Sequence, residues 1–292
     1  MHDKTRRVLN RVLSASVMTR LRDRFVKEAD ALIDELVERG SFDAIADLAE
    51  ALPADGVSRR HGHAAREPPL PVALRQHGLA WLQQQMQRDA FAADGFGAAI
   101  HAASDTGELT EEEAPIVARS LLTAGVDTTV SGIGAAVHCL ARFPKEFARL
   151  RADPSLARAA FEEAVRYETP VQTFFRTTMR PVELGGTAVD EGEKVLMFLG
   201  AANRDPRHWE CPDDYDITRR TVGHVGFGSG IHQCVGQLFG AARRRMRALR
   251  TRPQGRFDRD HRPDPPPLQQ HIARIVQPAG DCATGAGCPL MR

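Results

Sequence analysis

The most informative stretch of this chain is Phe227-Gly228-Ser229-Gly230-Ile231-His232-Gln233-Cys234-Val235-Gly236. It presents one thiol on a glycine-rich loop whose sequence leads into a helix. A helix N-terminus favours the thiolate form of a cysteine, and glycines let the backbone approach a flat ligand and leave N–H groups free to bond the sulfur. The pattern therefore predicts a soft metal ligand at Cys234. The alternative is a buried structural cysteine on a glycine-rich turn.

The same ten residues resemble the haem-binding loop of the cytochrome P-450 superfamily, whose pattern is Phe-x-x-Gly-x-x-x-Cys-x-Gly. The resemblance implies that Cys234 is the axial thiolate ligand of the haem iron. It also implies that Phe227 packs beside the haem face and that His232 contacts a haem propionate. Gly228 and Gly236 are the other residues of this loop that the resemblance assigns to the cofactor.

A second motif, Ala124-Gly125-Val126-Asp127-Thr128-Thr129, falls mid-way along an apolar segment, 111–142, that predicts a buried central helix. Its glycine and its β-branched threonines lower helix propensity and allow a local distortion. Taken alone, the motif is as well explained by a solvent-facing polar stripe. It resembles the P-450 oxygen-activation motif over the distal haem face. That implies that Thr128 steadies activated oxygen, that Asp127 relays protons, and that Ala124 and Gly125 lie against the cofactor.

A third motif sets a carboxylate, Glu163, and a guanidinium, Arg166, three residues apart on one helix face. Such pairs are usually surface decoration. Between the other two motifs, this pair resembles the structural Glu-x-x-Arg pair of the P-450 superfamily. The usual third partner, an arginine in a later loop, stays unassigned, because Asp214 stands where many members have Arg and Arg219 is only a substitute.

Three more basic residues match positions that bind haem propionates in the superfamily. Arg176 is expected on a strand after the helix of Glu163, while His2 and Arg6 lie four apart on the first helix. For each residue the alternative is an exposed basic side chain.

Helical patterns dominate the chain and strands are few, which predicts a mainly α fold with a small β component. Apolar spacing indicates two successive helices over 5–39, and Gly40 is a natural stop. The remaining elements are predicted as helices over 41–52, from 79 and over 153–167, and as strands over 171–199.

The family likeness covers residues 2–52 and roughly 79–238. We therefore expect an incomplete P-450 fold that lacks the N-terminal part, the lid helices and the regular C-terminal end. Residues 1–238 are predicted to form a partial haem-binding domain with an aberrant segment at 54–78, and 239–292 an irregular Arg/Pro-rich tail without a packed core. We hypothesise that these two segments, 54–78 and 239–292, which are both rich in Arg and Pro, are out-of-frame translations.

Bulk composition favours a soluble protein that acts on a small molecule. Lys and Arg total 39 against 38 for Asp and Glu, so the chain has no charge-based reason to bind nucleic acid or an anionic membrane. No apolar run approaches the roughly 18 residues needed to span a bilayer. Five scattered cysteines suit a reducing compartment. We expect a cytoplasmic monomer.

The resemblance implies a monooxygenase that inserts one oxygen atom from O2 into a small organic substrate. It would use haem b (iron protoporphyrin IX), a ferredoxin with its ferredoxin reductase, and NAD(P)H as the indirect electron donor. Within the superfamily the chain looks closest to bacterial enzymes that act on small aromatic carboxylic acids. One alternative is a non-catalytic, degraded gene product that binds haem at most. Another is nucleic-acid binding by the Arg-rich tail.

Overall fold

The computed structural model describes residues 2–51, 82–91, 93 and 95–238. The chain divides into two units, Met1–Arg256 and Phe257–Arg292, and every described residue belongs to the first. The predictions made for 54–78 and for 239–292 therefore lie outside the described residues.

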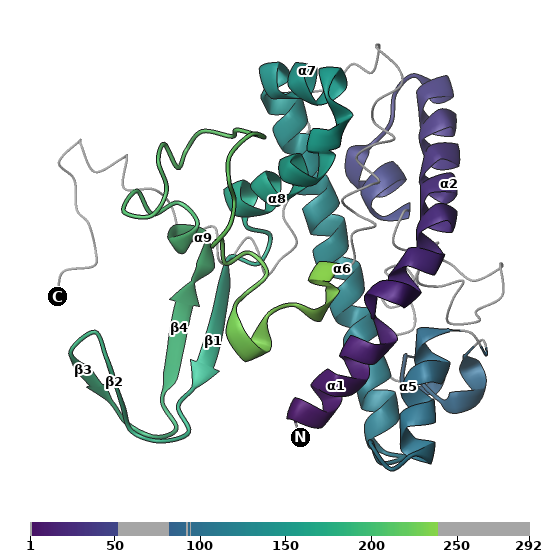
Figure 1. Cartoon of the computed structure of the whole chain (residues 1–292), viewed down its shortest axis with the longest axis vertical. Coiled ribbons are helices and arrows are strands. Elements are labelled where there is room, and N and C mark those ends of the chain that lie inside the picture. Colours follow the sequence, from purple (N-terminus) through teal and green to yellow (C-terminus); the bar gives the residue numbers. More distant parts are fainter. Residues whose placement is uncertain (1, 52–81, 92, 94, 239–292) are drawn as a thin grey trace, which may run out of the picture. The chain divides into compact units, whose positions relative to one another are not determined.

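Helices make up most of the described residues, as Figure 1 shows. The α-helices in this part of the chain are α1 (His2–Val12), α2 (Ala15–Arg39), α5 (Phe96–Asp105), α6 (Glu113–Arg142), α7 (Pro144–Ala152), α8 (Ala157–Glu168) and α9 (Leu199–Ala202). The shorter turns are η1 (Ala44–Ala49), η2 (Arg88–Ala90), η3 (Pro154–Leu156), η4 (Gly230–His232) and η5 (Val235–Leu238). The predicted mainly α fold with a small β component is confirmed.

The two helices expected over 5–39 are α1 and α2. Gly40 ends α2 as predicted: it adopts a left-handed conformation with φ 78°, and its N–H donates to the Val37 carbonyl. Of the helix expected over 41–52, the described residues 41–51 contain the π-helix Ala44–Ala49. Asp43 caps the start of this helix, because its Oδ1 accepts hydrogen bonds from the N–H groups of Ile45 and Ala46.

Helix α6 is the central element of the unit. One buried cluster joins its Leu122 and Val126 to Val8 of α1 and to Ile100 of α5. A second cluster joins its C-terminal half to α8 and α7. Contrary to the local distortion allowed for at 124–129, α6 is a continuous α-helix from Glu113 to Arg142, because packing on both sides outweighs the weak local propensities.

By length and composition alone, α6 would pass as a membrane-crossing helix, the one such helix among the described residues. Core helices of soluble proteins pass the same test, and 39% of the most apolar window of α6 is buried inside the unit.

Two small antiparallel sheets form the β component of the described residues. Strand β1 (Thr173–Thr177) pairs with β4 (Lys194–Phe198), and β2 (Val182–Leu184) pairs with β3 (Thr187–Val189). The predicted strand region over 171–199 is therefore confirmed.

Pro144 and Pro154 begin α7 and η3, where the missing N–H of proline costs nothing.

Candidate functional site

The loop that carries Cys234 follows η4 and is closed by its own backbone. The Cys234 N–H donates to the Phe227 carbonyl at 2.8 Å, and the Gly228 N–H donates to the Val225 carbonyl at 2.8 Å. Gly228 and Gly230 have φ of 67° and 63°, which only glycine adopts without strain. The loop thus folds back on itself and leaves the thiol of Cys234 exposed, which rules out the buried structural cysteine.

The start of this loop rests on α8. A Cβ added to Gly226 would lie 2.6 Å from Val165 Cγ1 and 3.1 Å from the Val165 carbonyl, so no side chain fits there. Phe227 packs against the buried cluster that holds Val165 and Phe161. The contacts of Phe227 in the structure are therefore with the protein core, and its expected place beside the haem face stays a prediction.

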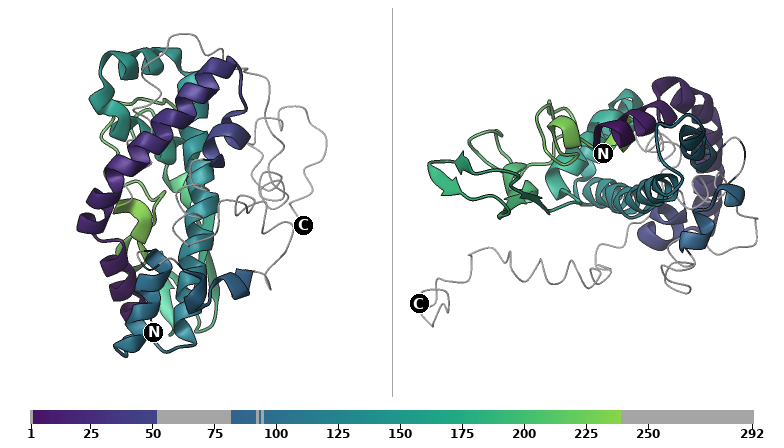
Figure 2. Two further views of the ribbon diagram at one scale, coloured as in Figure 1. Left: turned by 90° about the vertical axis from the view of Figure 1, so that its right-hand side faces the viewer. Right: turned by 90° about the horizontal axis from the view of Figure 1, so that it is seen from below.

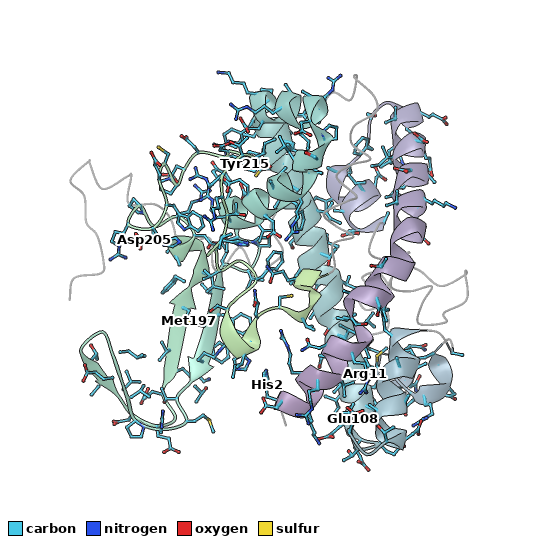
Figure 3. All side chains as sticks on the ribbon, viewed as in Figure 1. His2, Arg11, Glu108, Met197, Asp205 and Tyr215 are labelled. Carbon is cyan, nitrogen blue, oxygen red and sulfur yellow. The ribbon has the colours of Figure 1, made fainter. Side chains whose placement is uncertain are left out.

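At its other end the loop meets α1. The His2 and His232 rings lie 4.5 Å apart, centroid to centroid, and Arg6 Nη1 donates to the Gln233 carbonyl at 2.5 Å. Figure 3 labels His2 at the first turn of α1, and Figures 1 and 2 show the end of the described chain beside that helix. The structure thus brings together residues that lie about 230 positions apart in the sequence.

The charges around His232 complete a basic cluster, which we define as His2, Arg6, Arg176 and His232. Partial removal from water lowers the pKa of His232 below its ordinary value, and the nearby charges of Arg176, His2 and Arg6 lower it further. Arg176 lies on β1 as predicted, with its guanidinium over the Phe174 ring. Among the described residues, no ion pair joins Arg6, Arg176 or His232 to a carboxylate, while His2 lies 3.4 Å from Asp3.

The motif on α6 presents a polar surface. Thr128 Oγ1 donates to the Ala124 carbonyl at 2.7 Å, and both Thr128 and Asp127 are exposed. A Cβ at Gly125 would meet nothing within 4 Å. Val126, on the opposite side, is buried in the cluster against which Val235 of the cysteine loop also packs. The α6 motif and the Cys234 loop therefore share one core.

These residues fit a haem. The two propionate carboxylates of haem need cationic hydrogen-bond donors, which the basic cluster could provide. The haem iron needs a soft ligand, which the Cys234 thiol could provide. The open surface at Gly125 leaves room for a flat group. Within the described residues, no group of three or more His, Cys, Asp or Glu side chains could hold a metal ion by itself.

The Glu163–Arg166 pair is fully buried, which excludes the alternative of an ion pair on the protein surface. Arg166 Nε and Nη2 donate to the two Glu163 oxygens at 2.8 and 2.9 Å. The remaining guanidinium hydrogens reach the carbonyls of Asn203, Pro212 and Asp214. A buried charge pair is stable only when its other bonding positions are also filled, and here they are.

The third partner that the sequence left open is Arg219. Its Nε donates to Glu163 Oε1 at 3.0 Å, while its other nitrogens bond the Glu210, Cys211 and Asp214 carbonyls. The Asp214 carboxylate, which stands at the expected arginine position, takes no part in these bonds; only its backbone carbonyl does.

Two further residues escaped the sequence reasoning. Asn203 is 1% exposed and joins the Thr169 hydroxyl to the Val225 N–H, at 2.9 and 2.8 Å. His224 lies between Glu162 and the Gly226 N–H. No local pattern marks these residues, because their partners are distant in sequence.

Comparison with known proteins agrees with this geometry. A sequence model of the Cytochrome P450 family matches residues 80–251. "Cytochrome p450 CYP199A2" of Rhodopseudomonas palustris is 61% identical over 259 residues, covering 81% of this chain and 63% of its own length. "Cytochrome P450 107B1" of Saccharopolyspora erythraea is 36% identical over 254 residues, covering 80% and 63%.

Among solved structures, Mycobacterium smegmatis CYP164A2 with econazole bound superposes with a TM-score of 0.75 at 29% identity, covering 85% of this chain and 69% of that one. The present chain spans about 63% of the length of these two curated relatives, in line with the expected incomplete fold. Members of the family use haem b, O2 and electrons that come from NAD(P)H through redox partners. The sequence match and the shared fold together show that this chain belongs to the cytochrome P450 family.

Proposed function

We propose that the chain is a haem-thiolate monooxygenase, which inserts one oxygen atom from O2 into a small organic substrate. The observation that carries this proposal is the exposed Cys234 thiol, held on a closed loop next to a cluster of four basic side chains. When bound, haem would supply O2 binding and cleavage, which no side chain of the protein performs.

The chain's own residues would hold and orient that cofactor. Cys234 would provide the sulfur ligand. The basic cluster would bind the two propionates by charge-assisted hydrogen bonds and so hold the cofactor in place. Hydrogen bonds from backbone N–H groups of the glycine-rich loop to the sulfur would tune its electron donation.

On α6, Thr128 and Asp127 would handle protons. The Thr128 hydroxyl spends its hydrogen on the Ala124 carbonyl, so its oxygen lone pairs remain available as an acceptor. Asp127 is exposed on the same helix, where solvent can reach its carboxylate. A proton would then pass from solvent through Asp127 toward Thr128.

We further propose the substrate class, partners and location. The sequence resemblance favours a small aromatic carboxylic acid, electrons from a ferredoxin and its reductase, and a cytoplasmic monomer. The near-neutral charge balance supports a small-molecule role. Oxidation of aromatic acids by the purified chain with a bacterial ferredoxin pair tests this part.

The ferrous–CO spectrum of the 292-residue chain with added haem tests the central proposal. The expected result is a Soret band at the position typical of thiolate ligation, lost in Cys234→Ala. Cys211→Ala is the matched control, since Cys211 is also an exposed free cysteine, and it should keep the band. Absence of the band in the unmodified chain would favour the non-catalytic alternative. The 61% identity to CYP199A2 supports the monooxygenase over that alternative.

Thr128→Ala tests the proton-handling role. Product formed per O2 consumed should fall by roughly a hundredfold, the low end of what a positioned acid–base group contributes, while hydrogen peroxide accumulates. Thr123→Ala is the control, because Thr123 Oγ1 also donates to the carbonyl four residues earlier on α6, at 3.0 Å. Equal coupling in both variants would remove Thr128 from the mechanism.

A further inference from the structure

Residues 224–227, directly before the Cys234 loop, are attached to α8 through a buried histidine. His224 Nε2 lies 3.1 Å from Glu162 Oε2 on α8, with side chains only 7% and 10% exposed. On the other side of the ring, the Gly226 N–H donates to His224 Nδ1 at 3.3 Å. Since Nδ1 accepts, Nε2 carries the proton that faces the Glu162 carboxylate.

A second buried link runs parallel to the first. Asn203 accepts the Val225 N–H through Oδ1 at 2.8 Å and donates to the Thr169 hydroxyl just after α8. Consecutive residues, His224 and Val225, are therefore both tied to the α8 region, one by its side chain and one by its backbone.

This attachment continues to the thiol through two short steps. The His224 ring lies 5.6 Å from the Phe227 ring, and the Phe227 carbonyl accepts the Cys234 N–H at 2.8 Å. A shift of His224 would displace Gly226 and Phe227, and with them the acceptor that holds the Cys234 backbone. No other role described above uses the His224–Glu162 pair.

We propose that His224, held between Glu162 and the Gly226 N–H, is a positioning residue that sets the place of the Cys234 thiol by fixing the Phe227 carbonyl. The proposal rests on the proposed role of Cys234 as the iron ligand. Burial makes the arrangement selective, because a polar group out of water tolerates little departure from its bonding geometry.

Three substitutions separate the two bonds of the ring. His224→Phe keeps a ring beside Phe227 and removes both bonds. His224→Gln retains a donor toward Glu162, and His224→Asn retains an acceptor toward the Gly226 N–H. His138→Phe is the matched control, because His138 is an exposed residue of α6.

Two measurements follow the loop. Amide hydrogen exchange of the Cys234 N–H is recorded in the chain without haem, and the ratio of thiolate to non-thiolate Soret bands is recorded in the ferrous–CO form. His224→Phe should raise the exchange rate and lower the ratio by about tenfold each, the size expected for losing a buried bond to a charged group. His224→Gln should restore most of both, and His224→Asn less.

Retained helix content by circular dichroism in each variant shows that the fold survives. If His224→Phe matches His138→Phe in both measurements, or if His224→Gln fails to recover either signal, the positioning role is overturned. If the unmodified chain shows no thiolate band while His224→Phe still speeds exchange tenfold, the attachment of the loop is supported and the iron-ligand role of Cys234 is what fails.

Discussion

Helix α8 and the β1–β4 sheet differ in how completely their side chains are buried and hydrogen-bonded. On α8, Glu163 and Arg166 are fully buried and bonded at both ends of the pair. On the sheet, Phe175 and Leu196 face each other across the strands and are 55% and 52% exposed. Figure 1 shows β1 and β4 extending away from α8.

The same contrast appears in the charges. Arg166 and Arg219 donate to Glu163 and to backbone carbonyls. Within the described residues, Arg176 on β1 donates only to the carbonyl of its neighbour Phe175 and lies over a ring. Within the described residues, every guanidinium nitrogen of Arg166 and Arg219 is therefore bonded by the chain, whereas Arg176 of the basic cluster keeps hydrogen-bonding positions unfilled.

Glu163→Ala should cause the largest loss of stability, since it removes one partner of the fully buried Glu163–Arg166 pair. Removing one partner leaves the Arg166 charge buried, and the free energy of unfolding should fall by about 3–5 kcal/mol. Urea unfolding followed by circular dichroism measures this. Glu168→Ala, on the same helix but half-buried, should cost less than about 1 kcal/mol. Equal shifts in the two variants would show that the pair carries no special weight.

Phe175→Ala should cost much less, because half of the side chain already lies in water. We expect a loss below about 1 kcal/mol, against about 3–5 kcal/mol for Phe161→Ala in the buried cluster. Urea midpoints of both variants test the comparison. A loss at Phe175 as large as that at Phe161 would mean that the sheet is covered in solution.

Arg176→Gln should leave stability within about 0.5 kcal/mol and act only on charge. Partial burial and then the positive charge of Arg176 lower the pKa of His232, so its pKa should rise in this variant. A histidine with a lowered pKa takes up its proton later than the unfolded chain does as the pH falls. It therefore costs stability below its ordinary pKa, and this cost should shrink in the variant.

An NMR titration of the His232 ring without haem measures that shift. Arg180→Gln is the control, because Arg180 is exposed and does not contribute to the shift at His232. If the pKa of His232 is unchanged in Arg176→Gln, the basic cluster is not a single electrostatic unit.

Local patterns predicted much of this molecule. The loop around Cys234 has φ values at Gly228 and Gly230 that only glycine adopts easily, so its glycines indicate a tight loop from sequence alone. Apolar periodicity gave the long helix that became α6, and Gly40 gave the end of α2. The distortion allowed for near Thr128 did not occur, because local propensity is weak beside the packing of α6 on two clusters.

The thiol loop, the order of the helices and the Glu163–Arg166 pair can be predicted from sequence, since each depends on residues a few positions apart. Only the folded chain shows that Arg219 completes that pair, that His224 contacts Glu162, and that His2 contacts His232. These partners lie 56, 62 and 230 positions apart. Contacts over such separations depend on the path of the whole chain, and no local motif encodes that path.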